Sequence, residues 1–311
     1  MSFLMNVSVT RLFFPLLLCS ALGSIQTARG QSPALPAPAI FSMASFTSKH
    51  VDARRVDVWL PKGYRRENAS TYAVLYMHDG QNLFDTTFSY GGHEWHIDEV
   101  AARMLAADSL RPFIVVGVWN SPKRFREFAP EKPFARTPEA FQQQLGNERG
   151  RELYSDAYLR FLVSELKPFV DAQFGCSKRK EDTFIMGSSM GGLISLYAVL
   201  EYPAVFGGAA CVSTHWPLSL QKNDHAFSDV MGAYMQEKLP AAGNPKLYFD
   251  YGTTTLDSLY EPHQLHIDSV LRGMDYPAAR WKSLKFEGAA HKEASWAERV
   301  DIPLYFLLGK P

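Results

Sequence analysis

The feature that most constrains this chain is the segment from Phe184 to Gly192. Four residues suited to a buried parallel strand, Phe184 to Gly187, lead into the pattern Gly187-Ser188-Ser189-Met190-Gly191, and a helix-forming run follows. A serine on such a strand-to-helix turn is held in a strained backbone conformation, and the flanking glycines leave room for the tight approach. We expect the Ser189 hydroxyl to lie at the carboxyl edge of a sheet, with the positive end of a helix behind it. Ser189 is therefore the candidate nucleophile, and the alternative is a glycine-rich turn without a chemical role.

The overall composition is that of a globular enzyme. Of the residues, 46% are hydrophobic, and 32 basic side chains balance 32 acidic ones. A formal net charge of zero argues against nucleic acid or an anionic membrane surface as the main partner. The length of 311 residues permits two domains. A single α/β domain of this size is also common, and it buries about three quarters of its unfolded surface.

The N-terminal residues 1–30 have the pattern of a cleaved export signal. Arg11 precedes an apolar stretch that reaches Ile25, and Ala28-Arg29-Gly30 ends it in a small-x-small pattern. The stretch is too short and interrupted to span a bilayer well, although a retained anchor is the alternative. We expect a mature chain that begins at Gln31 and is periplasmic or secreted. Residues 31–45 are proline-rich and predict an extended tether, which leaves 46–311 as one catalytic domain.

Two cysteines remain after the signal, Cys176 and Cys211. A single pair in an exported protein is able to form a disulfide. However, Cys176 precedes the Ser189 strand, whereas Cys211 lies well inside the next apolar segment. Parallel neighbouring strands would place them several residues out of step, so we expect two separate thiols.

Strand and helix patterns alternate from about Phe41 onward. Such alternation predicts an α/β fold with a mostly parallel sheet covered by helices on both faces, and ligands bind beyond the carboxyl ends of its strands. Asn120 to about Gly150 lacks a regular pattern and indicates a lid or binding loop. The predicted strands are 56–60, 72–77, 113–118, 184–187, 208–212, 246–251 and 281–286, and predicted helices include 97–105, 262–272 and 292–308.

A serine nucleophile needs a base, and the base needs an orienting acid. His291 follows the last predicted strand in the small-residue turn Gly288-Ala289-Ala290, which places it at the carboxyl edge of the sheet. Asp257 follows the penultimate strand and fits the chain order serine, acid, histidine. Asp250 is the alternative acid, but it lies within that strand and is also explained by a structural role.

An oxyanion formed at the serine needs backbone N–H donors. Met190 directly follows Ser189 and is expected to supply one donor. The turn after strand 72–77 is expected to supply the other from Gly80 or Gln81, and the sequence does not separate these two. His78 and Asp79 are interpreted as residues that brace this turn.

Other residues are candidates for substrate contacts. Trp216 and His215 follow the strand 208–212 and are predicted to line an acyl or sugar pocket. Arg124 and Arg126 are suited to an anionic substrate, although ordinary surface charge is the better explanation.

No metal or cofactor is predicted. His93-Glu94-Trp95-His96 lacks the gap of a helical zinc protease motif, and His263 and His266 lie three apart without a third ligand nearby. No glycine-rich phosphate or dinucleotide loop follows the first strands.

The chain resembles the putative esterase family, which includes esterase D, feruloyl and acetylxylan esterases, enterochelin esterases and mycolyltransferase antigens. The matching segments are Tyr76 to Phe84, Val115 to Val118 with Glu127 to Pro130, Gly187 to Gly192, Gly252 to Asp257 and Gly288 to Trp296. The resemblance covers about Phe46 to Leu308. It implies an α/β-hydrolase fold with Ser189 as nucleophile, His291 as base and Asp257 as acid, although the acid is dispensable in some enterochelin-esterase-like relatives.

These observations together predict an exported serine esterase without a cofactor. Its expected substrates are small-molecule or glycan-linked esters, and acyl esters of carbohydrates come first because export places the enzyme near glycans. A siderophore esterase and an acyltransferase on the same fold are the alternatives. A catalytically inactive binding module is the alternative from another class.

Overall fold

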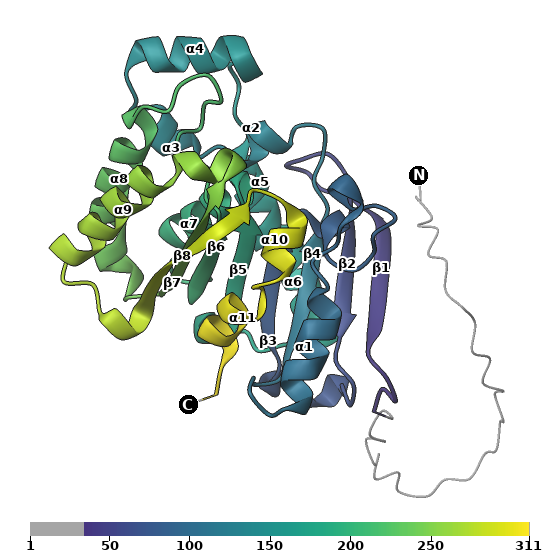
Figure 1. The fold of residues 1–311 in the computed structure, drawn as a ribbon. Helices are drawn as coiled ribbons and strands as arrows, with labels where there is room; N and C mark the ends of the chain where they lie inside the picture. The colour runs from purple at the N-terminus through teal and green to yellow at the C-terminus, as the bar shows by residue number, and fades with distance from the viewer. Residues whose placement is uncertain (1–33, 311) are drawn as a thin grey trace, which may run out of the picture. The chain divides into compact units, whose positions relative to one another are not determined.

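One eight-stranded sheet organises the molecule, and β5 (Thr183–Ser188), the strand that leads to Ser189, lies in its interior. The computed structural model describes residues 34–310. The strand order is β1-β2-β4-β3-β5-β6-β7-β8 (Figure 1). β2 pairs antiparallel with β1 and with β4, and the other neighbours are parallel. The predicted α/β architecture with a mostly parallel sheet is therefore confirmed.

The strands follow the predicted segments closely. Each buried strand is a run of apolar or β-branched residues between turn residues, as expected for a sheet covered on both faces. Their bounds are β1 (Ala39–Phe46), β2 (Arg54–Leu60), β3 (Ala73–His78), β4 (Phe113–Val118), β5 (Thr183–Ser188), β6 (Gly208–Val212), β7 (Lys246–Thr254) and β8 (Trp281–Ala290).

The predicted tether of residues 31–45 is wrong in its second half, because Ala39–Phe46 is the edge strand β1. Within residues 31–45 all prolines precede this strand, and Ala39 to Phe46 pairs with β2. The sequence does not reveal this strand, because an edge strand is only partly buried and these residues show no alternation of apolar and polar side chains. The predicted signal of residues 1–30 lies outside the described residues.

The helices vary widely in length. The α-helices are α1 (Ile97–Ala106), α2 (Arg124–Phe128), α3 (Glu131–Phe134), α4 (Glu139–Arg149), α5 (Ser155–Phe161), α6 (Lys167–Phe174), α7 (Met190–Glu201), α8 (Ala226–Ala242), α9 (Glu261–Gly273), α10 (Glu293–Ala297) and α11 (Asp301–Leu308). A π-helical segment, η4 (Leu162–Leu166), joins α5 to α6. The 3₁₀ segments are η1 (Arg66–Thr71), η2 (Gly80–Asn82), η3 (Tyr90–Gly92), η5 (Lys180–Asp182), η6 (Thr255–Leu259) and η7 (Ala278–Arg280).

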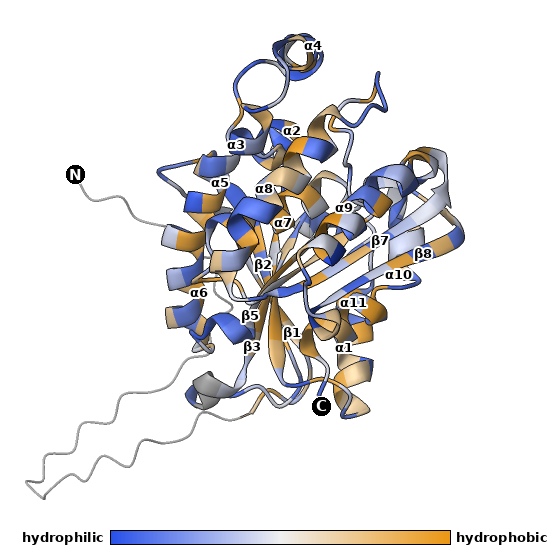
Figure 2. Ribbon diagram, turned by 90° about the vertical axis from the view of Figure 1, so that its left-hand side faces the viewer, coloured by the Kyte–Doolittle hydropathy of each residue, from blue (hydrophilic) through white to orange (hydrophobic). Residues whose placement is uncertain are grey.

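Helices cover both faces of the sheet (Figure 2). On one face, α5, α6, α7 and α8 contribute buried side chains to the larger apolar cluster. On the other face, α1 and α11 contribute to a second cluster with Trp296 of α10. α4 stands apart from the sheet at the top of Figures 1 and 2.

Two predicted segments differ from the structure. The expected loop from Asn120 to Gly150 contains the short helices α2, α3 and α4. Prolines at 130, 133 and 138 interrupt the first part of this segment, and α4 is largely polar apart from Phe141 and Leu145, so no clear helical period is visible. The single helix predicted for 292–308 is the pair α10 and α11, and Pro303 lies in the first turn of the second helix.

Cys176 and Cys211 are both buried and unbridged, as predicted. Within residues 34–310, no helix is both long and apolar enough to cross a membrane.

Candidate active site

Ser189 lies on a strained turn between β5 and α7, as the sequence predicts. Its φ of 59° and ψ of −121° are unusual for a residue with a side chain, and such conformations cost about 1–3 kcal/mol each. A Cβ on Gly187 would lie 2.9 Å from the backbone of Gly191, so the strand and the helix approach too closely for any side chain there. The Ser189 N–H donates to the Val212 carbonyl at 2.8 Å. The neighbouring strand β6 therefore helps to hold the serine in its strained conformation.

His291 and Asp257 meet beyond the ends of β8 and β7. The His291 Nδ1 lies 2.5 Å from the Asp257 Oδ1. The Thr255 hydroxyl accepts the His291 backbone N–H at 2.8 Å, which fixes the turn that carries the imidazole. Because Nδ1 faces the carboxylate, Nε2 is the nitrogen left for a reacting group.

Asp257 is fully buried, and a network holds its carboxylate. The Ser213 hydroxyl and the Gly252 N–H both donate to Oδ2 at 2.6 Å. Burial alone would raise the pKa of Asp257, but the hydrogen bond and charge of His291, together with Ser213 and Gly252, lower it overall. Asp257 is therefore ionised in the folded protein at neutral pH.

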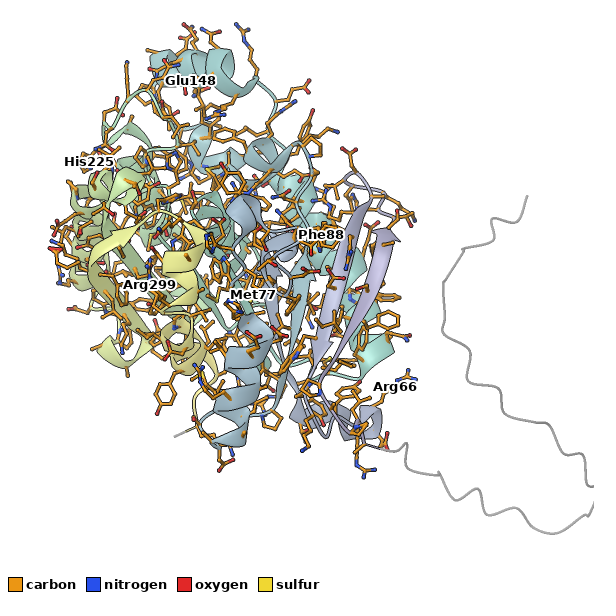
Figure 3. All side chains as sticks on the ribbon, turned by 45° about the vertical axis from the view of Figure 1, so that its right-hand side comes forward. Arg66, Met77, Phe88, Glu148, His225 and Arg299 are labelled. Atoms are coloured by element: carbon orange, nitrogen blue, oxygen red, sulfur yellow. The ribbon has the colours of Figure 1, made fainter. Side chains whose placement is uncertain are left out.

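Further side chains support Ser213 from behind. The Trp296 Nε1 donates to the Ser213 Oγ at 2.9 Å, and the Arg299 guanidinium donates to it at 3.0 Å. Arg299, labelled in Figure 3, also donates to the Asp250 Oδ1 at 3.0 Å. Asp250 is thus paired with Arg299 and Tyr248, not with His291. Of the two acid candidates that the sequence left open, Asp257 is therefore the one that contacts His291.

Ser189 and His291 face the same pocket, which has a volume of about 270 Å³. The pocket is lined by Asp79, Gln81, Asn82, Tyr90, Asn120, Arg124, Ser188, Ser189, His291, Glu293 and Trp296. Three elements far apart in the sequence, the turns after β3, β5 and β8, thus converge at one sheet edge. This convergence follows from the parallel pairing of β3 with β5 and of β7 with β8.

The two oxyanion candidates in the turn after β3 have different surroundings. Gln81 lines the pocket, whereas Gly80 packs against β4. A Cβ on Gly80 would lie 2.6 Å from the Gly117 carbonyl carbon, so this turn requires glycine. Met190 is the first residue of α7, where the N–H has no partner within the helix. The amides of Gln81 and Met190 are thus the candidate oxyanion donors.

An ion pair forms one wall of the pocket. Arg124 binds Asp79 through two hydrogen bonds of 2.6 and 2.7 Å, and Asn120 donates to the same carboxylate at 2.7 Å. Burial opposes the charge of Asp79, but Arg124 and Asn120 lower its pKa overall. Asp79 thus connects its turn to the segment after β4. Arg124 already has a carboxylate partner, so its role is to fix this wall.

The pocket also contains residues that the sequence did not single out as site residues, among them Asn82, Tyr90, Asn120 and Glu293. Burial, with the charge of Asp79, raises the pKa of Glu293. Its position two residues after His291 is the only sequence signal that could have found it.

The predicted pocket roles of Trp216 and His215 are wrong. Trp216 is fully buried, donates to Gln264 at 3.0 Å and packs against Phe249. His215 is also buried, and its Nδ1 lies 2.7 Å from the Tyr260 hydroxyl. Both residues follow β6, but they are buried and neither lines the pocket.

Within the part of the chain that the structure describes, no group of three or more histidine, cysteine or carboxylate side chains is arranged to hold a metal ion. His96 pairs with Glu99 at 2.6 Å. His263 lies between Ser228 and Asn223, at 2.9 and 3.0 Å.

The chain is similar to a known protein family and to individual known proteins. The family model described as putative esterase matches residues 48–301. The chain is 26% identical over 176 residues to the uncharacterised protein YbbA of Bacillus subtilis (strain 168). It is 25% identical over 191 residues to the ferri-bacillibactin esterase BesA of the same organism. These matches cover 56% and 58% of this chain, and 62% of the length of each relative.

A solved ferulic acid esterase has a similar fold. The TM-score is 0.62 at 16% identity, and the alignment covers 88% of this chain and 98% of that one. The likeness shows the α/β-hydrolase fold.

Proposed function

This chain belongs to the putative esterase family, and we propose that it is a serine carboxylic-ester hydrolase that works through Ser189, His291 and Asp257. The observation that carries the proposal is the 2.5 Å contact between His291 and Asp257, in a pocket that His291 shares with the strained Ser189. Nucleophile, base and orienting acid are the three groups that acyl transfer requires.

The proposed reaction proceeds through an acyl-enzyme. The Ser189 Oγ attacks the ester carbonyl while the His291 Nε2 accepts its proton, and Asp257 stabilises the imidazolium through Nδ1. The backbone N–H groups of Met190 and Gln81 bind the oxyanion, and one such donor is typically worth about 3 kcal/mol. His291 then returns the proton to the departing alcohol. A water molecule, deprotonated by His291, hydrolyses the acyl-enzyme by the same steps.

Replacement of the nucleophile tests the proposal. We expect Ser189→Ala to lose hydrolysis of p-nitrophenyl acetate and labelling by a fluorophosphonate. Ser195→Ala is the matched control, because this serine lies in α7 with its hydroxyl bonded to the Gly191 carbonyl. A Ser189→Ala protein that hydrolyses the ester at the parent rate refutes the assignment. Labelling of Ser189 in the parent also excludes an inactive binding module.

Acyl esters of carbohydrates are the substrates we propose first. The side-chain amide of Gln81 at the pocket is suited to a hydroxylated substrate, whereas the amides of Asn82 and Asn120 already donate to Glu293 and Asp79. The match to a ferri-bacillibactin esterase favours a siderophore ester as the second candidate. A panel of acetylated sugar, feruloylated sugar and siderophore esters, compared by kcat/KM, distinguishes the two. Added acceptor alcohol tests for acyl transfer in the same assay.

We also propose that the chain is exported. The support is the pattern of residues 1–30, a cationic start followed by an apolar stretch and a small-x-small end. N-terminal sequencing of protein recovered from the periplasm or medium should begin at Gln31. Recovery of the intact N-terminus in the membrane fraction favours a retained anchor instead.

A further inference from the structure

A buried tyrosine, Tyr260, contacts the acid and the base of the proposed triad. It follows η6, and its backbone N–H donates to the Asp257 carbonyl at 3.0 Å. Its ring meets the His291 ring edge to face, with centroids 5.6 Å apart. The side chain is fully buried, so it is not a surface of the substrate pocket. Tyr260 therefore limits the positions that the His291 ring is able to adopt.

The hydroxyl of Tyr260 reaches toward the nucleophile. It lies 2.7 Å from the His215 Nδ1, and the His215 backbone N–H donates to the Ser189 carbonyl at 3.2 Å. The Ser189 side chain also lies near enough to the Tyr260 hydroxyl to act on its pKa. Tyr260 and His215 thus connect the serine turn to the acid and the base through groups that are not exposed to solvent.

Neither member of this pair is suited to carry a proton during the reaction. Burial, followed by the charge of His291, lowers the pKa of His215 to about 3. Burial, followed by the charge of Asp257, raises the pKa of Tyr260 well above its ordinary value, although Ser189 acts in the opposite direction. Both groups therefore stay neutral over the usual assay range.

We propose that Tyr260 and His215 form a neutral positioning pair that holds the Ser189 hydroxyl and the His291 ring in the orientation required for proton transfer. This inference rests on the proposed function. The physical reason is that a misplacement of about 1 Å at reacting groups costs on the order of 100-fold in rate. The pair acts on the geometry of the triad and not on substrate binding.

Tyr260→Phe is the test, because it removes the hydroxyl and keeps the ring against His291. We expect the rate of Ser189 labelling by a fluorophosphonate, and kcat for an ester, to fall by about 10-fold or more, with KM changed less than about twofold. The pH profile should keep its shape at a lower plateau, because neither group of the pair titrates. A shift of the acidic or the basic limb of the pH profile contradicts a positioning role.

His215 variants provide an independent measurement. Asparagine places an amide near the position of the imidazole Nδ1, so His215→Asn should recover part of the rate that His215→Ala loses. Because the two residues act in one chain of contacts, Tyr260→Phe combined with His215→Ala should be no slower than His215→Ala alone. Additive losses overturn the proposal.

Tyr276→Phe is the matched control. It also removes a buried tyrosine hydroxyl, but that hydroxyl donates to the Pro245 carbonyl before β7, at the opposite end of the strand from the site. Equal rate losses per folded molecule in Tyr260→Phe and Tyr276→Phe overturn the proposal. The result that overturns only the pair is an inactive Ser189→Ala with a fully active Tyr260→Phe, whereas an active Ser189→Ala overturns the proposed function itself.

Discussion

At the scale of single residues, the backbone conformation of Ser189 and the burial of Asp257 matter most. The strained turn presents the serine hydroxyl to the pocket, and the fully buried carboxylate fixes the imidazole. The hydrogen bonds from Ser213 and Gly252 leave only one oxygen of Asp257, Oδ1, to face His291. These contacts are the reason that we propose Asp257, and not Asp250, as the orienting acid.

Asp257→Asn should lower kcat by about 10³- to 10⁴-fold, because an amide no longer stabilises the imidazolium or its tautomer. Hydrolysis of p-nitrophenyl acetate measures the loss. Asp250→Asn is the comparison, since Asp250 pairs with Arg299. We expect this variant to lose stability and to keep much more of its rate per folded molecule. The opposite ranking contradicts the assignment of the acid.

At the scale of elements, the segment from α10 to α11 connects the last helices to the site. It carries Trp296 and Arg299, which both donate to Ser213, the residue that holds Asp257. The Arg299 and Asp250 side chains are 5% and 0% exposed, so this ion pair lies within the protein. The segment from α10 to α11 therefore supports Asp257 through Ser213, and Trp296 of this segment also lines the pocket.

Arg299→Met should lower the free energy of unfolding by about 3–5 kcal/mol, because it leaves Asp250 buried without a charged partner. Urea unfolding measures the loss. Arg272→Met is the control, since Arg272 is 61% exposed and lies 3.9 Å from Asp268. A long contact to an arginine that is mostly in solvent contributes less than about 1 kcal/mol. Equal losses of unfolding free energy in Arg299→Met and Arg272→Met would contradict a special structural role for the pair of Arg299 and Asp250.

At the scale of the whole molecule, β1 extends the sheet beyond the predicted domain start. Phe46 packs against Phe161 and Phe169 of the helical layer, and Phe41 packs against Phe174. These contacts tie the N-terminal edge of the sheet to α5 and α6. The folded domain therefore includes β1, and Leu35 before it already exchanges backbone hydrogen bonds with Tyr64 and Gly63.

A chain that begins at Thr47 should be less stable than one that begins at Gln31 by at least about 2 kcal/mol, because it loses these phenylalanine contacts. It should also associate, since removal of β1 exposes the unpaired edge of β2. Urea unfolding and size-exclusion chromatography measure the two effects. Equal stability and an equal elution volume would restore the boundary at residue 46.

The pH dependence of folding should also reflect Asp257. Its pKa is lowered in the folded protein, so its ionisation stabilises the fold above the unfolded pKa of about 3.9. This stabilisation is lost as the pH falls through the lower, folded pKa. The difference in unfolding free energy between the parent and Asp257→Asn should therefore shrink below about pH 4. A constant difference from pH 7 to pH 3 contradicts this expectation.

The sequence by itself determined the mostly parallel α/β sheet without its edge strand β1, and it singled out the three residues that we propose as the triad. Ser189, His291 and Asp257 were found because each follows a buried strand, and parallel strands bring such turns to one edge. Local pattern is sufficient there, since a buried strand and a glycine-bounded turn depend on neighbouring residues.

Only the tertiary structure decided which side chains face the pocket. Trp216 and His215 also follow a strand, yet they are buried, while Glu293 and Asn120 reach the pocket from other turns. The choice between Asp257 and Asp250 likewise depended on Arg299, which lies far away in the sequence. Side-chain direction and long-range partners arise from packing between distant segments, and no local pattern encodes them.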